Sequence, residues 1–149
     1  MRTIRIQRDD FDAVAESAAL SAGKLEVGAV VTFTGIVRSD DGLSALALEH
    51  YPGMTEREIA RHADEAKRRW PLFGVTIVHR IGRLRPGENI VLVAVASTRR
   101  KAAFEAAEFL VDYLKTRAPF WKQEERGSAI YWVEAKESDE SAAARWNSV

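Results

Sequence analysis

The sequence predicts a single domain of the α+β class, with a mixed, largely antiparallel sheet and flanking helices. First, the chain has 149 residues, which is the length of one domain. Second, no internal repeat or Pro/Gly/Ser-rich linker divides it, so the domain is expected to span residues 1–149. Third, strand-like and helix-like stretches alternate along the chain, but hairpin-like neighbours outnumber clean βαβ units.

The composition excludes several classes of protein. Hydrophobic residues make up 46% of the chain and charged residues 30%, a globular balance that excludes wholesale disorder. The 22 Lys and Arg residues balance the 22 Asp and Glu residues. No overall field therefore attracts nucleic acid or an acidic membrane, and anion binding requires a local cluster. No apolar run approaches the ~20 residues that span a bilayer, and the N-terminus has no signal-peptide core, so we expect a soluble, cytoplasmic protein.

Two strands and a helix are predicted before residue 40. Alternation of charged and apolar residues predicts a short first strand over residues 4–6. A helix is expected next, capped by the aspartates at 9–10 and ended by Gly23. Residues 28–38 are rich in β-branched and aromatic side chains, which favours a strand, and Gly35 within it predicts a bulge or a close approach of the backbone.

The middle of the chain predicts a strand, a helix and a further strand. Residues 46–50 alternate in hydrophobicity, as a strand with one buried face does. Residues 55–58 resemble a capping box, and apolar residues follow at helical spacing as far as Trp70. Pro71 cannot continue that helix. Residues 75–81 then alternate as a third strand.

The last third predicts the central strand and the longest helix. Residues 89–97 are apolar on both faces, as expected of a strand in the middle of a sheet. A helix is expected over about residues 98–117, where it stops before a proline. Residues 120–124 and 130–136 predict a closing pair of strands, and residues 138–146 a short helix or tail.

A basic cluster stands at the start of the long predicted helix. Arg99, Arg100 and Lys101 lie where the helix dipole makes cations unfavourable, by about 0.3–1 kcal/mol each. Such a local conflict is typical of functional sites. An anionic ligand would reverse the sign of the interaction, because backbone N–H groups and arginines would then bind it together. The alternative is that these cations are simply solvated.

Two lysines flank the end of the same helix. Pro119 forces the chain out of the helix, so Lys115 and Lys122 can face one pocket. Lysines close to each other are easier to deprotonate, which suits a base or a nucleophile. The alternative for Lys115 is a simple interaction with the helix C-terminus. Arg38, at the end of a predicted strand, is a third basic candidate, with a surface arginine as its alternative.

Other site types receive no support from the sequence. The three histidines have no zinc-ligand spacing, so we predict no metal site and interpret them as core or surface residues. Gly-rich phosphate loops are absent. The chain contains no cysteine, which excludes disulfides, thiolate nucleophiles and sulfur carried on a side-chain thiol.

Several stretches carry a resemblance to a known family. They are, in chain order, 28–35 with 37–38, 48–54, 79–82, 104–106, 112–122 and 132–135. Together they resemble the large, catalytic subunits of molybdopterin synthase, the MoaE family, from about residue 28 to residue 146. The block 113–122, in which Tyr-Leu-Lys precedes Phe-Trp-Lys, is highly specific.

The resemblance implies a sulfurtransferase of molybdenum cofactor biosynthesis. Such subunits convert cyclic pyranopterin monophosphate into molybdopterin by installing two sulfurs as a dithiolene. The sulfur arrives as a thiocarboxylate on the Gly-Gly C-terminus of a small ubiquitin-like partner, whose tail enters a pocket of the large subunit. The implied fold is of the α/β hammerhead type, with two large subunits paired as a homodimer at the centre of a heterotetramer. We expect no resident cofactor and no nucleic-acid or membrane partner.

The resemblance also assigns the site. It gives catalytic roles to Lys115 and Lys122, which also bind substrate, and substrate-binding roles to Ile36, Val37, Arg38, Arg99, Arg100, Gln123 and Glu124. One position departs, because the family often has His where this chain has Arg99. Arginine keeps the positive charge but cannot exchange a proton near neutral pH, so a lysine or water would have to do so.

The residues fit this function independently of the resemblance. A chain without cysteine needs a sulfur donor in trans, and a phosphorylated pterin is an anion that the basic residues could hold. Two alternatives stay open at this point. One is a non-catalytic dimeric module that binds a phosphorylated metabolite or a partner's C-terminal tail, and the other is a purely structural homodimer.

Overall fold

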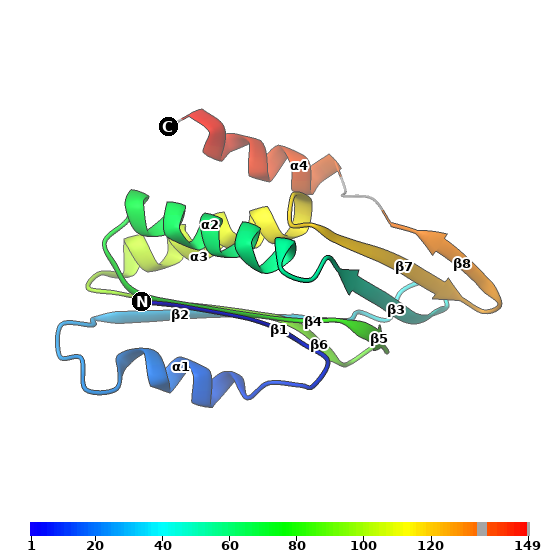
Figure 1. Cartoon of the computed structure of the whole chain (residues 1–149), viewed down its shortest axis with the longest axis horizontal. Helices are drawn as coiled ribbons and strands as arrows, with labels where there is room; N and C mark the ends of the chain where they lie inside the picture. The colour runs from blue at the N-terminus through cyan, green and yellow to red at the C-terminus, as the bar shows by residue number, and fades with distance from the viewer. Residues whose placement is uncertain (134–136, 149) are drawn as a thin grey trace.

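The computed structural model describes residues 1–133 and 137–148 and contains two sheets with helices on both sides of the first (Figure 1). In chain order the elements are β1 (Arg2–Gln7), α1 (Ala13–Ser21), β2 (Ala29–Ile36), β3 (Leu43–His50), α2 (Met54–Arg69), β4 (Leu72–Arg80), β5 (Gly82–Leu84), β6 (Asn89–Ser97), α3 (Arg100–Thr116), β7 (Phe120–Arg126), β8 (Ala129–Trp132), α4 (Glu137–Ala144) and a 3-10 turn (Arg145–Ser148).

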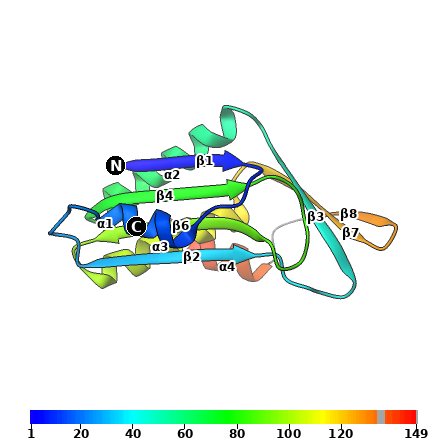
Figure 2. The ribbon, with the colours of Figure 1, turned by 90° about the horizontal axis from the view of Figure 1, so that it is seen from below.

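The strands divide into two four-stranded sheets. The first has the order β1-β4-β6-β2 (Figure 2), with β1 parallel to β4 and the other pairs antiparallel. The second has the order β5-β3-β7-β8 and is antiparallel throughout. The predicted α+β class with a largely antiparallel sheet and flanking helices is confirmed, with the strands shared between two sheets.

Strand β6 is the buried centre of the fold, as its composition predicts. Its residues from Val91 to Ser97 are all buried, because β4 and β2 flank it, α1 covers one face and α2 and α3 cover the other. The bulge predicted at Gly35 is also confirmed, since the register of β2 against β6 shifts between Gly35 and Ile36. A Cβ atom at Gly35 would lie 2.7 Å from the Val91 side chain, so only glycine fits there.

Helix α3 packs its apolar face on β6 and β2. Ala103, Ala107, Leu110 and Leu114 are buried along this face at the predicted helical spacing. Each Å² of apolar surface that this face removes from water stabilises the folded state by roughly 25 cal/mol. The orientation of α3 is thereby fixed, and with it the position of the lysine on its last turn.

The predicted capping box of α2 is wrong by two residues. The helix begins at Met54 with Gly53 as its N-cap, and the Gly53 N–H donates to the Glu56 carboxylate at 2.8 Å. Gly53 has φ +84°, a conformation that favours glycine. Thr55 is fully buried instead, because its hydroxyl accepts from the Tyr51 N–H and donates to the Pro119 carbonyl, both at 2.9 Å. The hydroxyl therefore ties the start of α2 to the start of β7.

The cap of the first helix also differs from the prediction. Asp12, not the aspartates at 9–10, is the N-cap of α1, and its carboxylate accepts from the Ala15 N–H at 3.1 Å. Asp10 has other partners, the Phe11 N–H and the Asn89 amide, which connect the segment before α1 to β6. Tertiary partners therefore decide which of three neighbouring carboxylates caps the helix.

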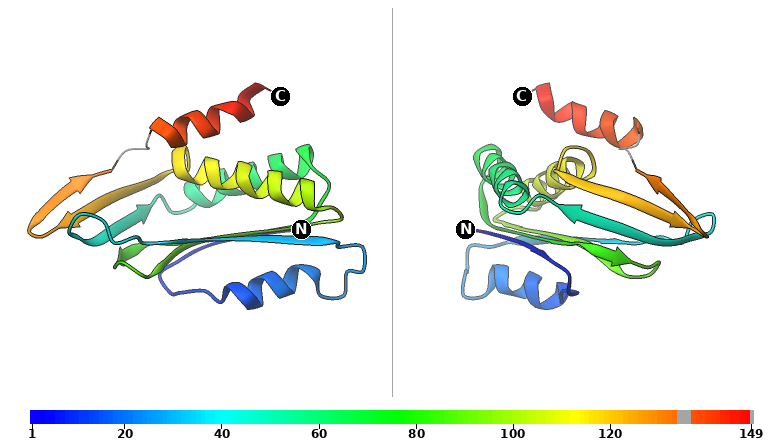
Figure 3. Two further views of the ribbon diagram at one scale, coloured as in Figure 1. Left: turned by 180° about the vertical axis from the view of Figure 1, so that it is seen from behind. Right: turned by 45° about the vertical axis from the view of Figure 1, so that its right-hand side comes forward.

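The C-terminal segment lies over α3 (Figure 3). Strands β7 and β8 form the predicted hairpin, and residues 134–136 of the predicted closing strand lie outside the described residues. The indole N–H of Trp146 donates to the Asp112 carboxylate at 2.7 Å, and its ring packs edge-on against Trp70 and Phe109. These contacts fix the 3-10 turn that follows α4 against α3 and against Trp70, which follows α2. No helix in the described ranges is long and apolar enough to cross a membrane.

Gly28 provides a test of the fold. A Cβ atom at this position would lie 2.2 Å from the Thr98 carbonyl oxygen, which belongs to the backbone and cannot move aside alone. We expect Gly28→Ala to lower the free energy of unfolding by about 1–3 kcal/mol through overpacking, measured by urea denaturation. Ser128→Ala, in the exposed turn between β7 and β8, is the control and should change it by less than about 0.5 kcal/mol. Equal midpoints for the two variants would contradict this account of Gly28.

Candidate active site

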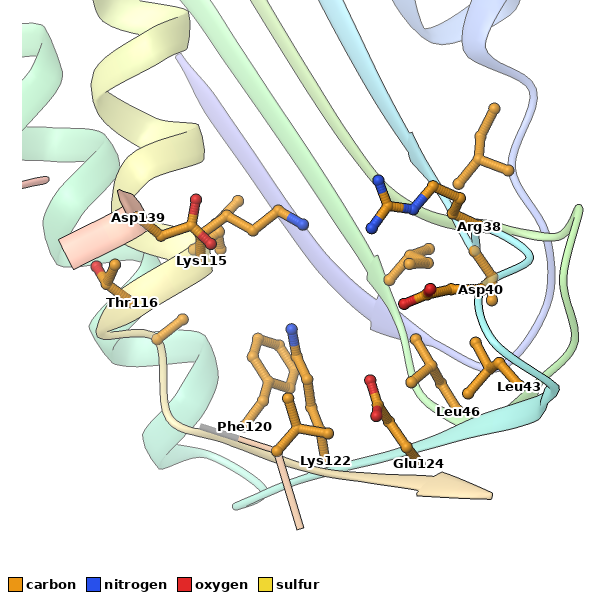
Figure 4. Close-up of a pocket in the computed structure, with 16 residues that line it drawn as sticks. Arg38, Asp40, Leu43, Leu46, Lys115, Thr116, Phe120, Lys122, Glu124 and Asp139 are labelled. Carbon is orange, nitrogen blue, oxygen red and sulfur yellow. The ribbon is translucent and has the colours of Figure 1, made fainter. Parts of the chain in front are cut away.

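A cavity of about 510 Å³ lies at the C-terminal end of α3, between that helix, the end of β2, and strands β3 and β7 (Figure 4). Six of the nine predicted site residues line it: Ile36, Val37, Arg38, Lys115, Lys122 and Glu124. They come from three separate parts of the chain. The structure thus brings together the end of β2, the end of α3 and the start of β7, where the sequence predicted these site residues.

The two lysines enter the cavity from opposite sides of the turn at Pro119. Lys115 lies on the last turn of α3, and Lys122 lies on β7. Side chains alternate along a strand, so Lys122 shares its face with Phe120 and Glu124, which also line the cavity. Figure 4 shows the ammonium groups of both lysines pointing into the same space.

Lys122 has an unusual environment for a lysine. Burial lowers its pKa from the ordinary value, and the positive charge of Lys115 lowers it further, while Asp139 and Glu124 act in the opposite direction. The ammonium group of Lys122 therefore loses its proton more readily than that of a solvated lysine. A lysine that releases its proton more readily is better suited to proton transfer than a solvated one.

Arg38 reaches the cavity from the loop that follows β2. The neighbouring Val37 is buried and anchors this loop, because its N–H donates to the Glu88 carbonyl at 2.8 Å and its own carbonyl accepts from the Gly87 N–H at 2.7 Å. The Arg38 guanidinium then points toward Lys115 across the cavity (Figure 4). Three cations thus converge on one space, which suits an anionic ligand.

Three carboxylates also line the cavity: Asp40, Glu124 and Asp139. Glu124 was predicted as a site residue, whereas sequence reasoning missed the other two. Asp40 stands in a polar loop and Asp139 lies on α4, 24 positions after Lys115 in the chain, so neither belongs to a recognisable pattern. The only available signal was that Asp40 follows Arg38 closely.

Three of the predicted site residues, Arg99, Arg100 and Gln123, do not line this cavity. Arg99 and Arg100 lie at the other end of α3, and Arg100 is roughly 22 Å from Lys115 along the helix axis, at about 1.5 Å per residue. Arg99 lines a separate shallow hollow with Trp70 and Pro71. Gln123 lies on the opposite face of β7, since its neighbours Lys122 and Glu124 point inward.

His79 lies behind Phe120, one of the residues that line the cavity. Its ring stacks on Phe120 with centroids 4.0 Å apart, and its Nδ1 lies 2.8 Å from the Arg80 carbonyl oxygen. A carbonyl only accepts, so Nδ1 carries the hydrogen and donates. Burial lowers the pKa of His79 to about 3, the charges of Lys122 and Lys115 act in the same direction, and the hydrogen bond to Arg80 opposes them. His79 is therefore a neutral core residue.

No metal centre accompanies these groups in the described part of the chain. Residues 1–133 and 137–148 contain no group of three or more His, Asp or Glu side chains placed to hold a metal ion. The charged side chains that line the cavity are those of lysine, arginine, aspartate and glutamate.

The fold and the cavity define a class of protein, an α+β protein with a pocket lined by two lysines, an arginine and three carboxylates. The chain belongs to the MoaE family, whose sequence pattern, described as "MoaE protein", matches residues 6–117. It is 64% identical to the molybdopterin synthase catalytic subunit of Mesorhizobium japonicum over 98% of this chain and 94% of that protein. The predicted family, sulfurtransferase class and catalytic-subunit function are therefore confirmed.

Solved structures agree with this assignment. The structure described as molybdopterin cofactor biosynthesis protein E from Burkholderia multivorans is 51% identical, covers 99% of this chain and 97% of its own, and superimposes with a TM-score of 0.85. A protein–protein complex of subunits 1 and 2 of molybdopterin-converting factor from Helicobacter pylori contains a chain of the same fold. That chain is 24% identical, with 91% of this chain and 90% of that one covered and a TM-score of 0.72.

The neutral state of His79 makes a prediction about pH. Its folded-state pKa is about 3 and the unfolded value is 6.5, so the unfolded chain binds one proton more between these two values. Stability should therefore fall as the pH drops below 6.5, by about 1.4 kcal/mol per pH unit from this residue. His62, whose pKa burial also lowers, contributes in the same direction.

The measurement is the free energy of unfolding in urea at pH 7 and pH 5, for the natural chain and for His79→Phe. Phenylalanine keeps a ring against Phe120 but has no group to protonate, so the variant should lose less stability between the two pH values. The same loss in both proteins would show that His79 is not buried in its neutral form.

Proposed function

We propose that the cavity binds cyclic pyranopterin monophosphate together with the C-terminal thiocarboxylate of a small ubiquitin-like subunit, and transfers sulfur from the second to the first. The observation that carries the proposal is the convergence of Arg38, Lys115 and Lys122 on one cavity of about 510 Å³. Both ligands are anions, and arginine and lysine are the side chains that bind phosphate and carboxylate groups. In this proposal cyclic pyranopterin monophosphate is the substrate and molybdopterin is the product, and neither is a resident cofactor.

The two lysines have different roles in the proposed reaction. Lys115 is exposed at the helix end, and it activates the substrate or relays protons as the thiocarboxylate sulfur bonds to a pterin side-chain carbon in place of an oxygen, which leaves with a proton. Water then cleaves the bond between this sulfur and the acyl carbon of the partner's tail, so the partner leaves as a carboxylate and each of the two sulfurs consumes one thiocarboxylate. Lys122 is more deeply placed on β7, and it stabilises developing negative charge and positions the partner's tail. Arg38 holds the phosphate and the pterin. The lowered pKa of Lys122 is consistent with a proton exchange within this group.

The sulfur donor is proposed to be a separate subunit. The chain has no cysteine on which sulfur could be carried, so the donor must act in trans. The H. pylori structure of the same fold is a complex of two different subunits. An extended Gly-Gly tail fits a narrow cavity because it has no side chains, and its terminal anion would meet the cations described above.

A second copy of this chain is proposed to complete the site. Arg99 and Arg100 are too far from Lys115 to serve the same cavity within one chain. In a homodimer at the centre of a heterotetramer, the N-terminal end of α3 of one copy can lie beside the cavity of the other. The basic cluster would then act on substrate from the partner, and its unfavourable position at a helix start would be offset by the bound anion.

Replacing Lys115 tests the catalytic assignment. We expect Lys115→Ala to abolish molybdopterin formation in a single-turnover assay with thiocarboxylated partner and cyclic pyranopterin monophosphate, with thermal stability and partner binding near normal. Arg117→Ala is the matched control, because Arg117 is a cation two residues further on that lines a different hollow, and it should keep activity. Wild-type turnover by Lys115→Ala would refute the assignment. Binding of both ligands without product by the natural chain would favour the non-catalytic module.

Mixing two inactive variants tests the shared site. Lys115→Ala and Arg100→Ala each damage both cavities of a homodimer if Arg100 acts across the interface. In a mixed dimer one cavity carries both substitutions and the other carries none. Equal mixing should therefore restore about a quarter of the wild-type activity. If Arg100→Ala alone keeps full activity, or if mixing restores none after subunit exchange has been verified, Arg100 does not act in trans.

A further inference from the structure

We propose that Arg126 is a positioning residue of the site, which orients Arg38 and neutralises two carboxylates of the cavity without touching the substrate. Arg126 lies at the end of β7 and does not line the cavity. The proposal rests on the proposed function, because its effect is exerted on the group that binds the anionic substrate. Arg126 belongs to none of the sequence motifs described above, and the lining of the cavity does not include it.

The contacts of Arg126 join two walls of the cavity. Its Nη1 donates to the carbonyl oxygens of Asp40 and Asp41, at 2.8 and 2.9 Å. Its Nε and Nη2 donate to the Glu124 carboxylate at 3.3 and 3.1 Å, and Nη2 lies 3.6 Å from the Asp40 carboxylate. One planar guanidinium therefore holds both the loop that carries Arg38 and the strand that carries Lys122. A guanidinium donates hydrogen bonds from three nitrogen atoms and can reach all of these acceptors, whereas the ammonium of a lysine donates from one nitrogen.

The loop that Arg126 holds has a conformation that requires support. Asp41 has φ +39°, and among the described residues it is the only one other than glycine with a positive φ. Gly42 follows with φ +76°. The Leu43 N–H donates to the Asp40 carbonyl, but Arg126 is the partner of the Asp41 carbonyl. A residue held in this part of conformational space persists only where its surroundings fix it. Without Arg126, the segment after Arg38 would lose that restraint.

Arg126 also determines the charge that a ligand meets. The cavity is lined by three cations and by three carboxylates, which leaves no net charge of either sign. Arg126 pairs with two of those carboxylates, Asp40 and Glu124, from outside the cavity. Figure 4 shows the Asp40 carboxylate near Arg38 and the Glu124 carboxylate near Lys122. Without Arg126 these carboxylates would be free to pair with the cations, and an anionic substrate would have to displace them.

The experiment measures kcat and KM for cyclic pyranopterin monophosphate, with the natural chain, Arg126→Gln and Arg126→Lys, each assembled with thiocarboxylated partner. We expect Arg126→Gln to raise KM roughly ten- to a hundredfold, with a much smaller change in kcat, since a misplaced binding group costs this much. Arg126→Lys keeps the charge but not the fork of donors, so its KM should be intermediate. Arg83→Gln is the control, because Arg83 pairs with Glu125 on the opposite face of the same sheet and should leave KM unchanged.

A double-mutant cycle separates positioning from general stability. If Arg126 acts through Arg38, adding Arg126→Gln to an Arg38→Gln chain should raise KM by much less than it does in the natural chain. Equal increases in the two backgrounds, or an Arg126→Gln chain with natural KM, would overturn the proposal. A lower melting temperature with an unchanged KM would also overturn it. If the natural chain itself forms no product, the proposed function fails, and that result is distinct from a failure at Arg126.

Discussion

The break in the chain at Pro119 is the constraint on which the site depends. Proline cannot continue α3, so the helix ends and the chain enters β7 within three residues, which places Lys115 and Lys122 on adjoining walls of one cavity. The turn is fixed from two directions. The buried Thr55 hydroxyl donates to the Pro119 carbonyl, and the His79 ring supports Phe120 from below. The missing N–H of Pro119 and the buried contacts on either side of it thus place a helix end and a strand start at one cavity.

Electrostatic balance is the second organising feature of the cavity. Cations from a loop, a helix and a strand would repel one another in a partly buried space, and carboxylates from three other positions offset that repulsion. In the proposed function, an anionic ligand binds where these carboxylates have other partners. Arg126 provides such partners for two of them from outside. In the proposed role of Arg126, the same contacts that order the loop leave Arg38 available for the anionic substrate.

The sequence predicted the regular elements well where a local pattern coincides with burial. Strand β6 and helix α3 follow directly from an apolar run and a helical spacing, since both are buried over most of their length. Prediction was weaker at helix ends. The capping box of α2 was misplaced because Thr55 makes a long-range bond to Pro119, and the cap of α1 was misplaced because Asp10 pairs with Asn89. In both cases a partner distant in the chain competes with the local one, and no local rule contains that information.

By itself the sequence determined the chemistry of this protein. The absence of cysteine excludes a sulfur carrier on a thiol, and the Lys-containing block around Pro119 resembles the family to which the chain belongs. Only the tertiary structure decided which charged groups meet. Arg38, Asp40 and Asp139 reach the cavity from distant positions, whereas Arg99 and Arg100 lie at the far end of a rigid helix. The physical reason is that residue types and spacing fix local geometry, but convergence depends on how α3 and β7 pack against the two sheets.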